Sequence, residues 1–598
     1  MPRLRPNVAL LAVVTGAALF RAAYLLQYRA ASVFYDTPFL DAAVYDGWAR
    51  RIAAGAWLPA EAFFFPPGYA YALGALYRVG LSAPTSVYVA QQGLGLLNIV
   101  LIHRIADRAF GSRVALATAM LAALYAPLPF LETKLMSATL ALTLLLGAIA
   151  MLGAAQARGG ARRWAGAGVL LGATSLLRPD TLLAGPFLVA WLARWTPSSA
   201  SRSRWQTTMV AMAALLLGWA APIVPVAIHN LGAGGSLISA QGGMTFYQAN
   251  NARARGLYVL MRDEGFSGSP ADEPDEEKAI AERAVGHPLS RAEVSAYWRD
   301  KGLQFIRNSP GRFVWLLGMK VVRYVGSYEY STEFILPVER ERVWLLWLPV
   351  VPFALLVALT LPALPRRHGA AEWLLLAVLA SNLLTVLVFY VSSRYRFASL
   401  PTLLVFAGAT LVGLVDAVRD RRRAAAARTA ALVFAVFMVA HFETDAASVF
   451  QEANAHFNTG SAWAKKGDQE RAVAEFQRAI AMDATRYDFW FAQGHSLGVL
   501  GRRAEAAVAY GEAARRRPQL FLPRVLEGQM REELGDLAGA RAAYERAEAI
   551  NPDDFELELA LGEVTERLGD REAAIRHLDH ALVLRPDSAA ARSLRDRL

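Results

Sequence analysis

The stretch SATLALTLLLGAIAMLGAA, residues 137–155, carries no charged side chain and is long enough to cross a bilayer as one helix. Other apolar runs in the first 450 residues are 7–27, 85–103, 113–131, 164–178, 181–195, 207–228, 343–361, 372–391, 397–416 and 428–442. The composition agrees, since 55% of the 598 residues are hydrophobic and only 19% are charged. The sequence therefore predicts an all-α, polytopic transmembrane bundle of about eleven spans over residues 1–445.

The net charge of +11 is divided unevenly along the chain. Residues 1–450 carry 41 Lys and Arg against 26 Asp and Glu, whereas residues 451–598 carry 21 against 25. Arginines of the first part concentrate in short breaks between alternate apolar runs, and such breaks stay in the cytoplasm. We therefore expect a multi-pass protein of the inner (plasma) membrane, with residues 28–84, 229–342 and 446–598 extracytoplasmic. The positive charge is explained by these cytoplasmic loops, so no nucleic-acid partner is expected.

One apolar segment does not fit the alternation of successive loops between the cytoplasmic and outer sides of the membrane. Residues 313–328, FVWLLGMKVVRYVGSY, have Lys320 and Arg323 near their centre. Counting this segment as a crossing would place a later arginine-rich break outside the cell. We predict an amphipathic helix that lies on the outer face of the membrane.

Residues 453–586 repeat with a period of 34 residues. The clearest columns are Gly460, Gly494, Gly528 and Gly562; Gly467, Gly501, Gly535 and Gly569; and Phe476, Tyr510, Tyr544 and Leu578. Small residues allow paired helices to approach, and the large residue fills the space between them. The pattern predicts a second domain, residues 446–598, of four tetratricopeptide repeats and a capping helix. Its groove is expected to bind a protein; packing on the membrane domain or self-association is the alternative.

The first long loop places a carboxylate where the first span meets the outer interface. In FLDAAVYDGWARRIAAG (39–55), Asp41, Tyr45 and Trp48 share one stripe of a helix, whereas Asp46 points elsewhere. A carboxylate at this depth is a candidate general base, and a helix cap or a solvated surface group is the structural alternative.

These features resemble the multi-spanning glycosyltransferases of the GT-C fold, in the branch of the protein O-mannosyltransferases and the lipid A aminoarabinose transferase. The matching motifs are Asp41 with Tyr45; Pro66, Pro67 and Tyr69; RIADRAFGSR (104–113); Tyr125, Pro127 and Glu132; Arg178, Pro179 and Asp180; GGMTFYQANN (242–251); and RYRF (394–397). The resemblance implies transfer of a sugar from a polyprenyl phosphate to an acceptor at the outer face, usually with inversion. Repeats behind such a domain also resemble the animal O-mannosyltransferases with tetratricopeptide repeats, in architecture alone.

The resemblance implies roles for individual residues. Asp41 is expected to be the catalytic base, and cations are expected to bind the departing lipid phosphate. The candidate substrate-binding residues are Tyr45, Asp46, Tyr69, Glu132, Lys134, Arg178, Gln248, Asn250, Asn251, Arg394 and Arg396. Arg394 and Arg396 are the phosphate candidates, because guanidinium groups match phosphate geometry.

Each of these residues also has a structural interpretation. Glu132 and Lys134 could compensate one another, and Arg178 could form a local ion pair with Asp180. The two arginines of RYRF could snorkel to the interface, and Asp46 fits a solvated surface. Arg21 in the first span faces either a cavity or the surface, and Gln248, Asn250 and Asn251 could serve ordinary loop folding.

No metal ligands are expected from the sequence. Cysteine is absent, and His103, His229, His287 and His441 have no ligand spacing. The acidic run 262–277 is expected to be a mobile, solvated segment. No cofactor is expected beyond the lipid-linked sugar donor, although a divalent metal stays open because GT-C enzymes differ in metal dependence.

The expected function is a membrane glycosyltransferase whose acceptor, a protein or a glycan, is recruited by the repeats. Two alternatives stay open at this point. The first is an envelope oligosaccharide ligase or polymerase that uses a lipid-diphosphate donor. The second is a non-catalytic, membrane-anchored scaffold that acts through its tetratricopeptide repeats.

Overall fold

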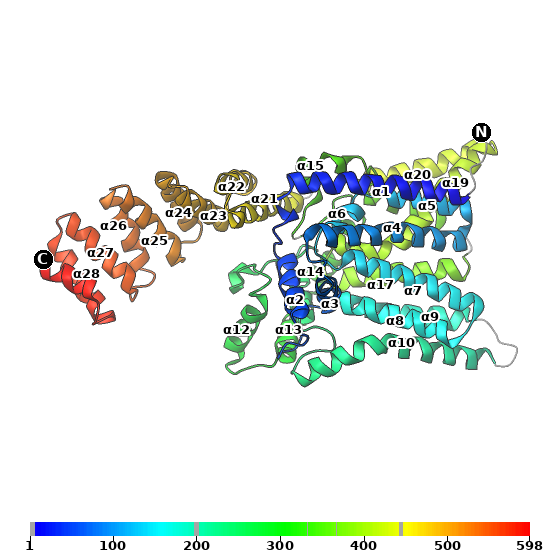
Figure 1. Cartoon of the computed structure of the whole chain (residues 1–598), viewed down its shortest axis with the longest axis horizontal. Coiled ribbons are helices and arrows are strands. Elements are labelled where there is room, and N and C mark those ends of the chain that lie inside the picture. The colour runs from blue at the N-terminus through cyan, green and yellow to red at the C-terminus, as the bar shows by residue number, and fades with distance from the viewer. Residues whose placement is uncertain (1–5, 197–202, 332, 366–367, 442–445) are drawn as a thin grey trace. The chain divides into compact units, whose positions relative to one another are not determined.

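The computed structural model describes the chain except for residues 1–5, 197–202, 332, 366–367 and 442–445 (Figure 1). The described residues form α-helices and 3-10 helices joined by turns and loops, and they include no β-strand. They make two compact units, Met1–Thr444 and Asp445–Leu598. The predicted all-α class is confirmed.

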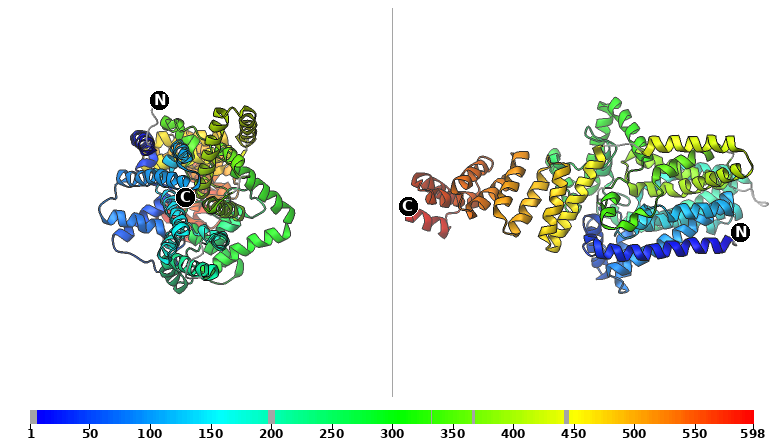
Figure 2. Two further views of the ribbon diagram at one scale, coloured as in Figure 1. Left: turned by 90° about the vertical axis from the view of Figure 1, so that its right-hand side faces the viewer. Right: turned by 90° about the horizontal axis from the view of Figure 1, so that it is seen from above.

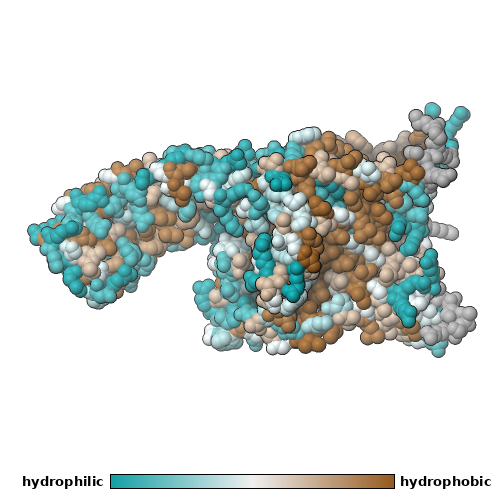
Figure 3. Space-filling model, in the orientation of Figure 1, coloured by the Kyte–Doolittle hydropathy of each residue, from teal (hydrophilic) through white to brown (hydrophobic). Residues whose placement is uncertain are grey.

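The first unit is built around a bundle of long apolar helices. Five of these helices form a row in which each packs against the next: α1 (Pro6–Ala31), α4 (Pro84–Phe110), α7 (Ala138–Arg158), α8 (Ala161–Leu177) and α10 (Arg204–Gly232). The other apolar helices are α5 (Ser112–Ala123), α9 (Gly185–Trp195), α16 (Phe353–Thr360), α17 (Ala370–Val388), α19 (Leu400–Arg419) and α20 (Arg423–His441). Among the described residues, seven helices are long and apolar enough to cross a membrane. Figure 3 shows apolar side chains gathered over the bundle, as a lipid-facing surface requires.

Three of the expected spans differ from single long helices. The run 113–131 is divided into α5 and α6 (Pro127–Glu132). The run 343–361 has a 3-10 turn at Trp344–Trp347 before α16, and the run 181–195 becomes α-helical only at Gly185. Prolines explain these breaks, because proline lacks the N–H that a continuing helix needs. The number of crossings therefore stays a prediction.

Glycines let two helices of the row approach closely. A Cβ atom at Gly168 or Gly172 of α8 would lie 2.2–2.3 Å from a carbonyl oxygen of α10. A Cβ atom at Gly218 of α10 would lie 2.1 Å from the carbonyl oxygen of Ala165. Small residues are the usual means by which membrane helices pack, since burial from lipid gives no hydrophobic gain.

The two long loops fold into short helices that gather at one end of the bundle (Figures 1 and 2). The first loop contributes α2 (Asp41–Ala53) and α3 (Gly68–Arg78). The second loop contributes α11 (Gly242–Ala249), α12 (Glu273–Val285), α13 (Arg291–Asn308), α14 (Pro310–Val325) and α15 (Leu336–Arg342). Segments far apart in the sequence thus cover the same end of the bundle.

The predicted amphipathic helix corresponds to α14, and its charges point into the protein. Lys320 and Arg323 are buried, whereas Val314, Trp315 and Val321 are exposed. The Lys320 ammonium donates hydrogen bonds to Asn250 Oδ1 at 3.0 Å and to the Leu387 carbonyl at 2.9 Å. Burial lowers the pKa of Lys320 to about 7. The exposed face of α14 is therefore apolar, which suits a helix at a membrane surface.

The second unit consists of four helix pairs and a final helix. The pairs are α21 (Ala446–Lys466) with α22 (Gln469–Met482), α23 (Tyr487–Val499) with α24 (Arg503–Arg516), α25 (Phe521–Glu533) with α26 (Leu537–Glu548), and α27 (Phe555–Arg567) with α28 (Arg571–Leu584); α29 spans Ala589–Arg597. A Cβ atom at Gly528 would lie 2.4 Å from the Tyr544 ring, and Gly460, Gly494 and Gly562 meet their large partners similarly. The turn glycines, such as Gly535 with φ of 81°, adopt the left-handed region. The predicted tetratricopeptide repeats are confirmed.

Candidate active site

The carboxylate predicted as the base lies beside an arginine predicted to bind phosphate. Asp41 begins α2, and Arg394 lies in α18 (Ser393–Arg396), between α17 and α19. Arg394 Nη1 donates a hydrogen bond to Asp41 Oδ2 at 3.0 Å. Their side chains are 20% and 22% exposed, so a ligand can reach the ion pair. The fold thus brings together two residues that are 353 positions apart.

The backbone before Asp41 is held in an unusual conformation. Leu40 has φ of 51°, a value that favours glycine. A non-glycine residue held in such a region costs about 1–3 kcal/mol, which the surrounding structure must offset. The conformation places Asp41 in the first turn of α2, where the partial positive charge of a helix N-terminus favours a carboxylate.

A second carboxylate shares this arginine. Glu333 Oε1 lies 3.4 Å from Arg394 Nη1, and the Glu333 side chain is only 4% exposed. Burial and the negative charge of Asp41 raise the pKa of Glu333 well above its usual value. Sequence reasoning missed this residue, although an acid directly before the apolar residues FIL (334–336) was a signal.

An open cavity of about 140 Å³ surrounds the ion pair. Arg178, which the sequence predicted as a substrate-binding residue, lines this cavity. Its Nη1 donates a hydrogen bond to the Arg394 carbonyl at 3.0 Å. The Arg178–Asp180 ion pair suggested by the sequence is present at 3.1 Å. Further lining residues are Tyr45, Phe65, Pro66, Ser137, Ser239, Gln241, Gly242, Thr245, Phe389, Tyr390 and Tyr395. The cavity thus combines two cations, the carboxylates of Asp41 and Asp180, hydroxyl groups and aromatic faces.

The two predicted tyrosines occupy successive layers beside Asp41. Tyr45 lines the cavity, and its ring packs edge-on against Tyr69 with 5.2 Å between centroids. The Tyr69 hydroxyl lies behind it and donates a hydrogen bond to Gln91 Oε1 at 2.9 Å. Tyr45 is therefore positioned to contact a ligand, whereas Tyr69 supports Tyr45.

Known families match both parts of the chain. Residues 65–229 match the family model of the dolichyl-phosphate-mannose-protein mannosyltransferases, and residues 533–598 match the tetratricopeptide-repeat model. The chain carries a GT-C-type glycosyltransferase domain. The matched region of this domain includes Tyr69 and Arg178, while Asp41 precedes it and Arg394 follows it.

Solved structures similar to part of the chain have low sequence identity to it. A structure described as a crystal structure of MamA is 18% identical, with a TM-score of 0.21, and the match covers 22% of this chain and 77% of that one. A structure of YrrB, described as a TPR protein with an unusual peptide-binding site, is also 18% identical, with a TM-score of 0.23 and coverages of 31% and 88%. A search of curated proteins found no match.

One predicted acid of the glycosyltransferase domain lies away from the cavity. Asp46 accepts hydrogen bonds from Arg50 at 2.8 Å and from the Tyr77 hydroxyl at 2.6 Å. These contacts hold α2 against α3. Asp46 therefore has a local structural partner, and the geometry gives it no contact with the cavity.

Glu132 and Lys134 are both buried, but they do not compensate one another as the sequence suggested. Glu132 forms a two-point ion pair with Arg21 of α1, with both contacts at 2.7 Å. Lys134 lies 3.6 Å from Glu339 and donates a hydrogen bond to the Tyr28 hydroxyl at 2.9 Å. The internal pairing was thus wrong because tertiary partners from α1 and α15 satisfy both charges. Arg21 faces the protein interior.

The predicted amide residues at the end of α11 and just after it make internal hydrogen bonds. Gln248 Nε2 donates to Glu273 Oε1 at 3.1 Å, Asn250 Nδ2 to the Val388 carbonyl at 2.8 Å, and Asn251 Nδ2 to the Tyr247 carbonyl at 2.9 Å. The cavity is lined instead by the start of this segment, Gln241, Gly242 and Thr245.

The two arginines of the RYRF motif point to different surroundings. Arg396 is fully buried, lies 3.6 Å from Glu329 and donates a hydrogen bond to the Tyr328 carbonyl at 2.9 Å. Interfacial snorkelling is therefore wrong for Arg396, and the geometry offers it no contact with the cavity. Arg394 alone of this pair reaches the cavity.

The acidic run 262–277 is not a solvated segment throughout. Glu273 starts α12, where burial and the charge of Asp41 raise its pKa to about 7. Glu277 is fully buried, and neither of its carboxylate oxygens has a hydrogen-bond partner within the described residues. Burial raises the pKa of Glu277 to about 9. The solvated interpretation was wrong here because α12 turns these acids toward α13 and α11.

We expect the raised pKa of Glu277 to make stability depend on pH. The pKa of Glu277 is raised from 4.5 to about 9 in the folded state. The contribution of its protonated form to the free energy of unfolding is therefore complete below pH 4.5 and is lost as the pH rises toward 9. The loss is at most about 1.4 kcal/mol per pH unit. The thermal stability of the wild type should therefore fall more steeply between pH 6 and 9 than the thermal stability of Glu277→Gln.

Glu276→Gln provides the matched control, since Glu276 lies on the same helix and binds the Ser267 backbone N–H at 3.1 Å. This variant should keep the wild-type pH profile. Parallel profiles for the wild type and Glu277→Gln would contradict the buried, protonated state of Glu277.

Proposed function

We propose that the chain transfers a sugar from a polyprenyl-phosphate donor to an acceptor hydroxyl at the extracytoplasmic face of the membrane. The observation that carries the proposal is the contact of Asp41 with Arg394, at 3.0 Å, on the wall of a cavity that also contains Arg178. A base beside phosphate-binding cations is what displacement of a lipid phosphate by a hydroxyl requires.

In the proposed step, the acceptor oxygen attacks the anomeric carbon while Asp41 takes its proton. The bond between the anomeric carbon and the phosphate oxygen breaks, and its electron pair leaves with the lipid phosphate. Glu333 is buried and its pKa is raised well above its usual value, whereas Asp41 lines the cavity, so Asp41 is the carboxylate that we assign to accept the new proton. Glu333 is thus a positioning residue in this proposal.

Arg394 and Arg178 would receive the phosphate. The contacts of Arg394 with Asp41 and Glu333 both use Nη1, and a guanidinium carries further N–H groups on Nε and Nη2. Arg178 is linked to the Arg394 backbone, so the two cations are held on one side of the cavity. The developing negative charge is compensated without movement of distant groups.

A neighbouring cavity offers a route for the acceptor. It has a volume of about 460 Å³ and shares Ser239, Gly242 and Phe389 with the cavity around Asp41. Its other lining residues include Ser236, Ser295 and Arg299. We assign this cavity to a hydroxyl-bearing acceptor. The tetratricopeptide repeats, which serve protein interaction in general, would recruit that acceptor or a protein partner.

The proposal is tested in two steps. Glycan mass spectrometry of a deletion strain against its parent identifies the missing sugar and its acceptor. Purified protein in liposomes is then supplied with that sugar on a polyprenyl monophosphate or diphosphate, with EDTA or with MgCl₂. We expect transfer from the monophosphate. Transfer from the diphosphate alone would indicate an oligosaccharide ligase, and an unchanged glycan profile would favour a scaffold.

A further inference from the structure

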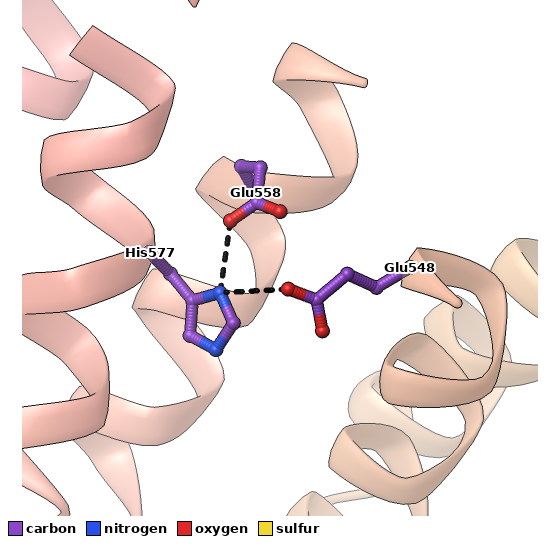
Figure 4. A group of neighbouring side chains, drawn as sticks. All are labelled: Glu548, Glu558 and His577. Carbon is purple, nitrogen blue, oxygen red and sulfur yellow. Dashed lines mark hydrogen bonds and ion pairs between the residues drawn. The ribbon is translucent and has the colours of Figure 1, made fainter. Parts of the chain in front are cut away.

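Four metal-ligating side chains converge in the last two tetratricopeptide repeats. They come from three helices: Glu548 ends α26, Glu558 lies in α27, and His577 and His580 lie in α28. His577 Nδ1 lies 2.8 Å from Glu558 Oε2 and 3.6 Å from Glu548 Oε1 (Figure 4). His580 Nδ1 lies 3.3 Å from Glu558 Oε1. Ligand atoms of Glu548, Glu558 and His577 thus lie within 4.8 Å of one another, and His580 adjoins the second oxygen of Glu558.

The burial of Glu558 makes this arrangement unusual. Its side chain is 1% exposed, and its Oε1 atom accepts no hydrogen bond within the described part of the chain. The imidazoles of His577 and His580 lie within ion-pair distance of Glu558, and an imidazole is charged only when protonated. A buried carboxyl group is stabilised either by protonation or by a cation that pairs with it or coordinates it. Carboxylate oxygens of Glu558 and Glu548 beside an imidazole nitrogen form an arrangement that a bound cation would stabilise.

The cluster has no counterpart one repeat earlier. One period of 34 residues earlier, the corresponding positions are Ala514, Arg524, Ala543 and Arg546. None of these is a metal-ligating residue, so the repeat fold itself does not demand the cluster.

The first repeat contains half of the same arrangement. His456 and Glu475 occupy the positions that correspond to Glu558 and His577, with the two residue types exchanged, and they pair at 2.7 Å. Arg478 lies 3.8 Å from Glu475. The first repeat therefore has a histidine–glutamate pair with an arginine nearby, whereas the last repeat adds a second glutamate and a second histidine.

We propose that Glu548, Glu558, His577 and His580 bind one divalent transition-metal ion of the zinc class. Imidazole nitrogen and carboxylate oxygen are both zinc ligands at about 2.0–2.2 Å, which separates the ligands of a tetrahedral site by roughly 3.3 Å. One ligand atom each from Glu548, Glu558 and His577 lie within 4.8 Å of one another, so small side-chain rotations suffice. The imidazoles favour zinc over calcium or magnesium, which prefer oxygen ligands.

The ion would tie α26, α27 and α28 together and set the geometry of the C-terminal end of the repeats. His577 and His580 stand three residues apart on α28, so both imidazoles face the same side of that helix. The site lies in the tetratricopeptide unit and is independent of the sugar-transfer proposal, and either can fail without the other.

The test uses the full-length protein, purified without a polyhistidine tag and stripped with a chelator. Calorimetric titration with ZnCl₂ should give one tight equivalent per chain, and CoCl₂ should give visible absorption bands of a four-coordinate ion. The double variant His577→Ala/His580→Ala should lose at least tenfold in affinity. His456→Ala is the matched control and should bind zinc as the wild type does.

Glu548→Gln keeps the test decisive if the double variant does not fold. The Glu548 side chain is 31% exposed at the end of α26, so its amide is tolerated in the fold, and zinc affinity should fall at least tenfold. Absence of saturable binding to the wild type, or wild-type affinity in the folded variants, would overturn the proposal.

Discussion

Replacement of Asp41 by asparagine is expected to lower the turnover number for sugar transfer by about 10²- to 10⁴-fold. Asparagine has nearly the same shape but cannot take the proton of the acceptor hydroxyl. The loss should appear in kcat, while the KM for the lipid-linked donor changes little, because Arg394 and Arg178 remain. The measurement is the initial rate of transfer in liposomes with the donor identified from the glycan profile.

Asp46→Asn is the matched control for this experiment. Asp46 lies on the same helix as Asp41 but binds Arg50 and Tyr77 outside the cavity. This variant should keep wild-type turnover. If Asp41→Asn transfers sugar at the wild-type rate, Asp41 is not the base, and the acid that remains beside it, Glu333, becomes the residue to test.

Replacement of Arg394 by glutamine should lower kcat/KM by about 10²- to 10³-fold, the usual effect of removing a group that stabilises developing negative charge. The variant should also bind the released polyprenyl phosphate more weakly, which product inhibition measures. Arg394→Lys keeps the charge but loses the planar fork, so it should recover part of the activity. Asp41→Asn should leave product inhibition unchanged, which separates the two roles.

Arg50→Gln is the control for lost positive charge, because Arg50 lies on α2 with its side chain 58% exposed. We expect wild-type kinetics from this variant. Unchanged inhibition by polyprenyl phosphate in Arg394→Gln would place the phosphate elsewhere, and Arg178 would then be the next cation to replace.

The sequence was sufficient to predict the features that depend on a local pattern of residues. The period of 34 residues predicted every helix pair of the second unit. In each pair one glycine of the repeating column faces a large residue of the next helix: Gly460, Gly494, Gly528 and Gly562. The helical stripe of Asp41 and Tyr45 likewise predicted two residues that line one cavity.

Tertiary contacts account for what the sequence did not predict. Arg394 and Arg396 are two residues apart in one motif, yet packing of the short helix α18 turns the first toward the cavity and buries the second. Glu132 meets Arg21 across 111 residues, which no spacing rule indicates. Glu333 was missed because its proximity to Asp41 depends on how the second long loop folds.

The assembly of the cavity also has a consequence for biosynthesis. Asp41 leaves the ribosome 353 residues before Arg394, and Glu333 is made only shortly before that arginine. During most of translation, the nascent chain therefore holds Asp41 without the arginine that pairs with it. Under the proposed function, a product that ends before residue 394 could not consume the lipid-linked sugar pool. Completion of the polypeptide thus acts as a built-in safeguard for the donor.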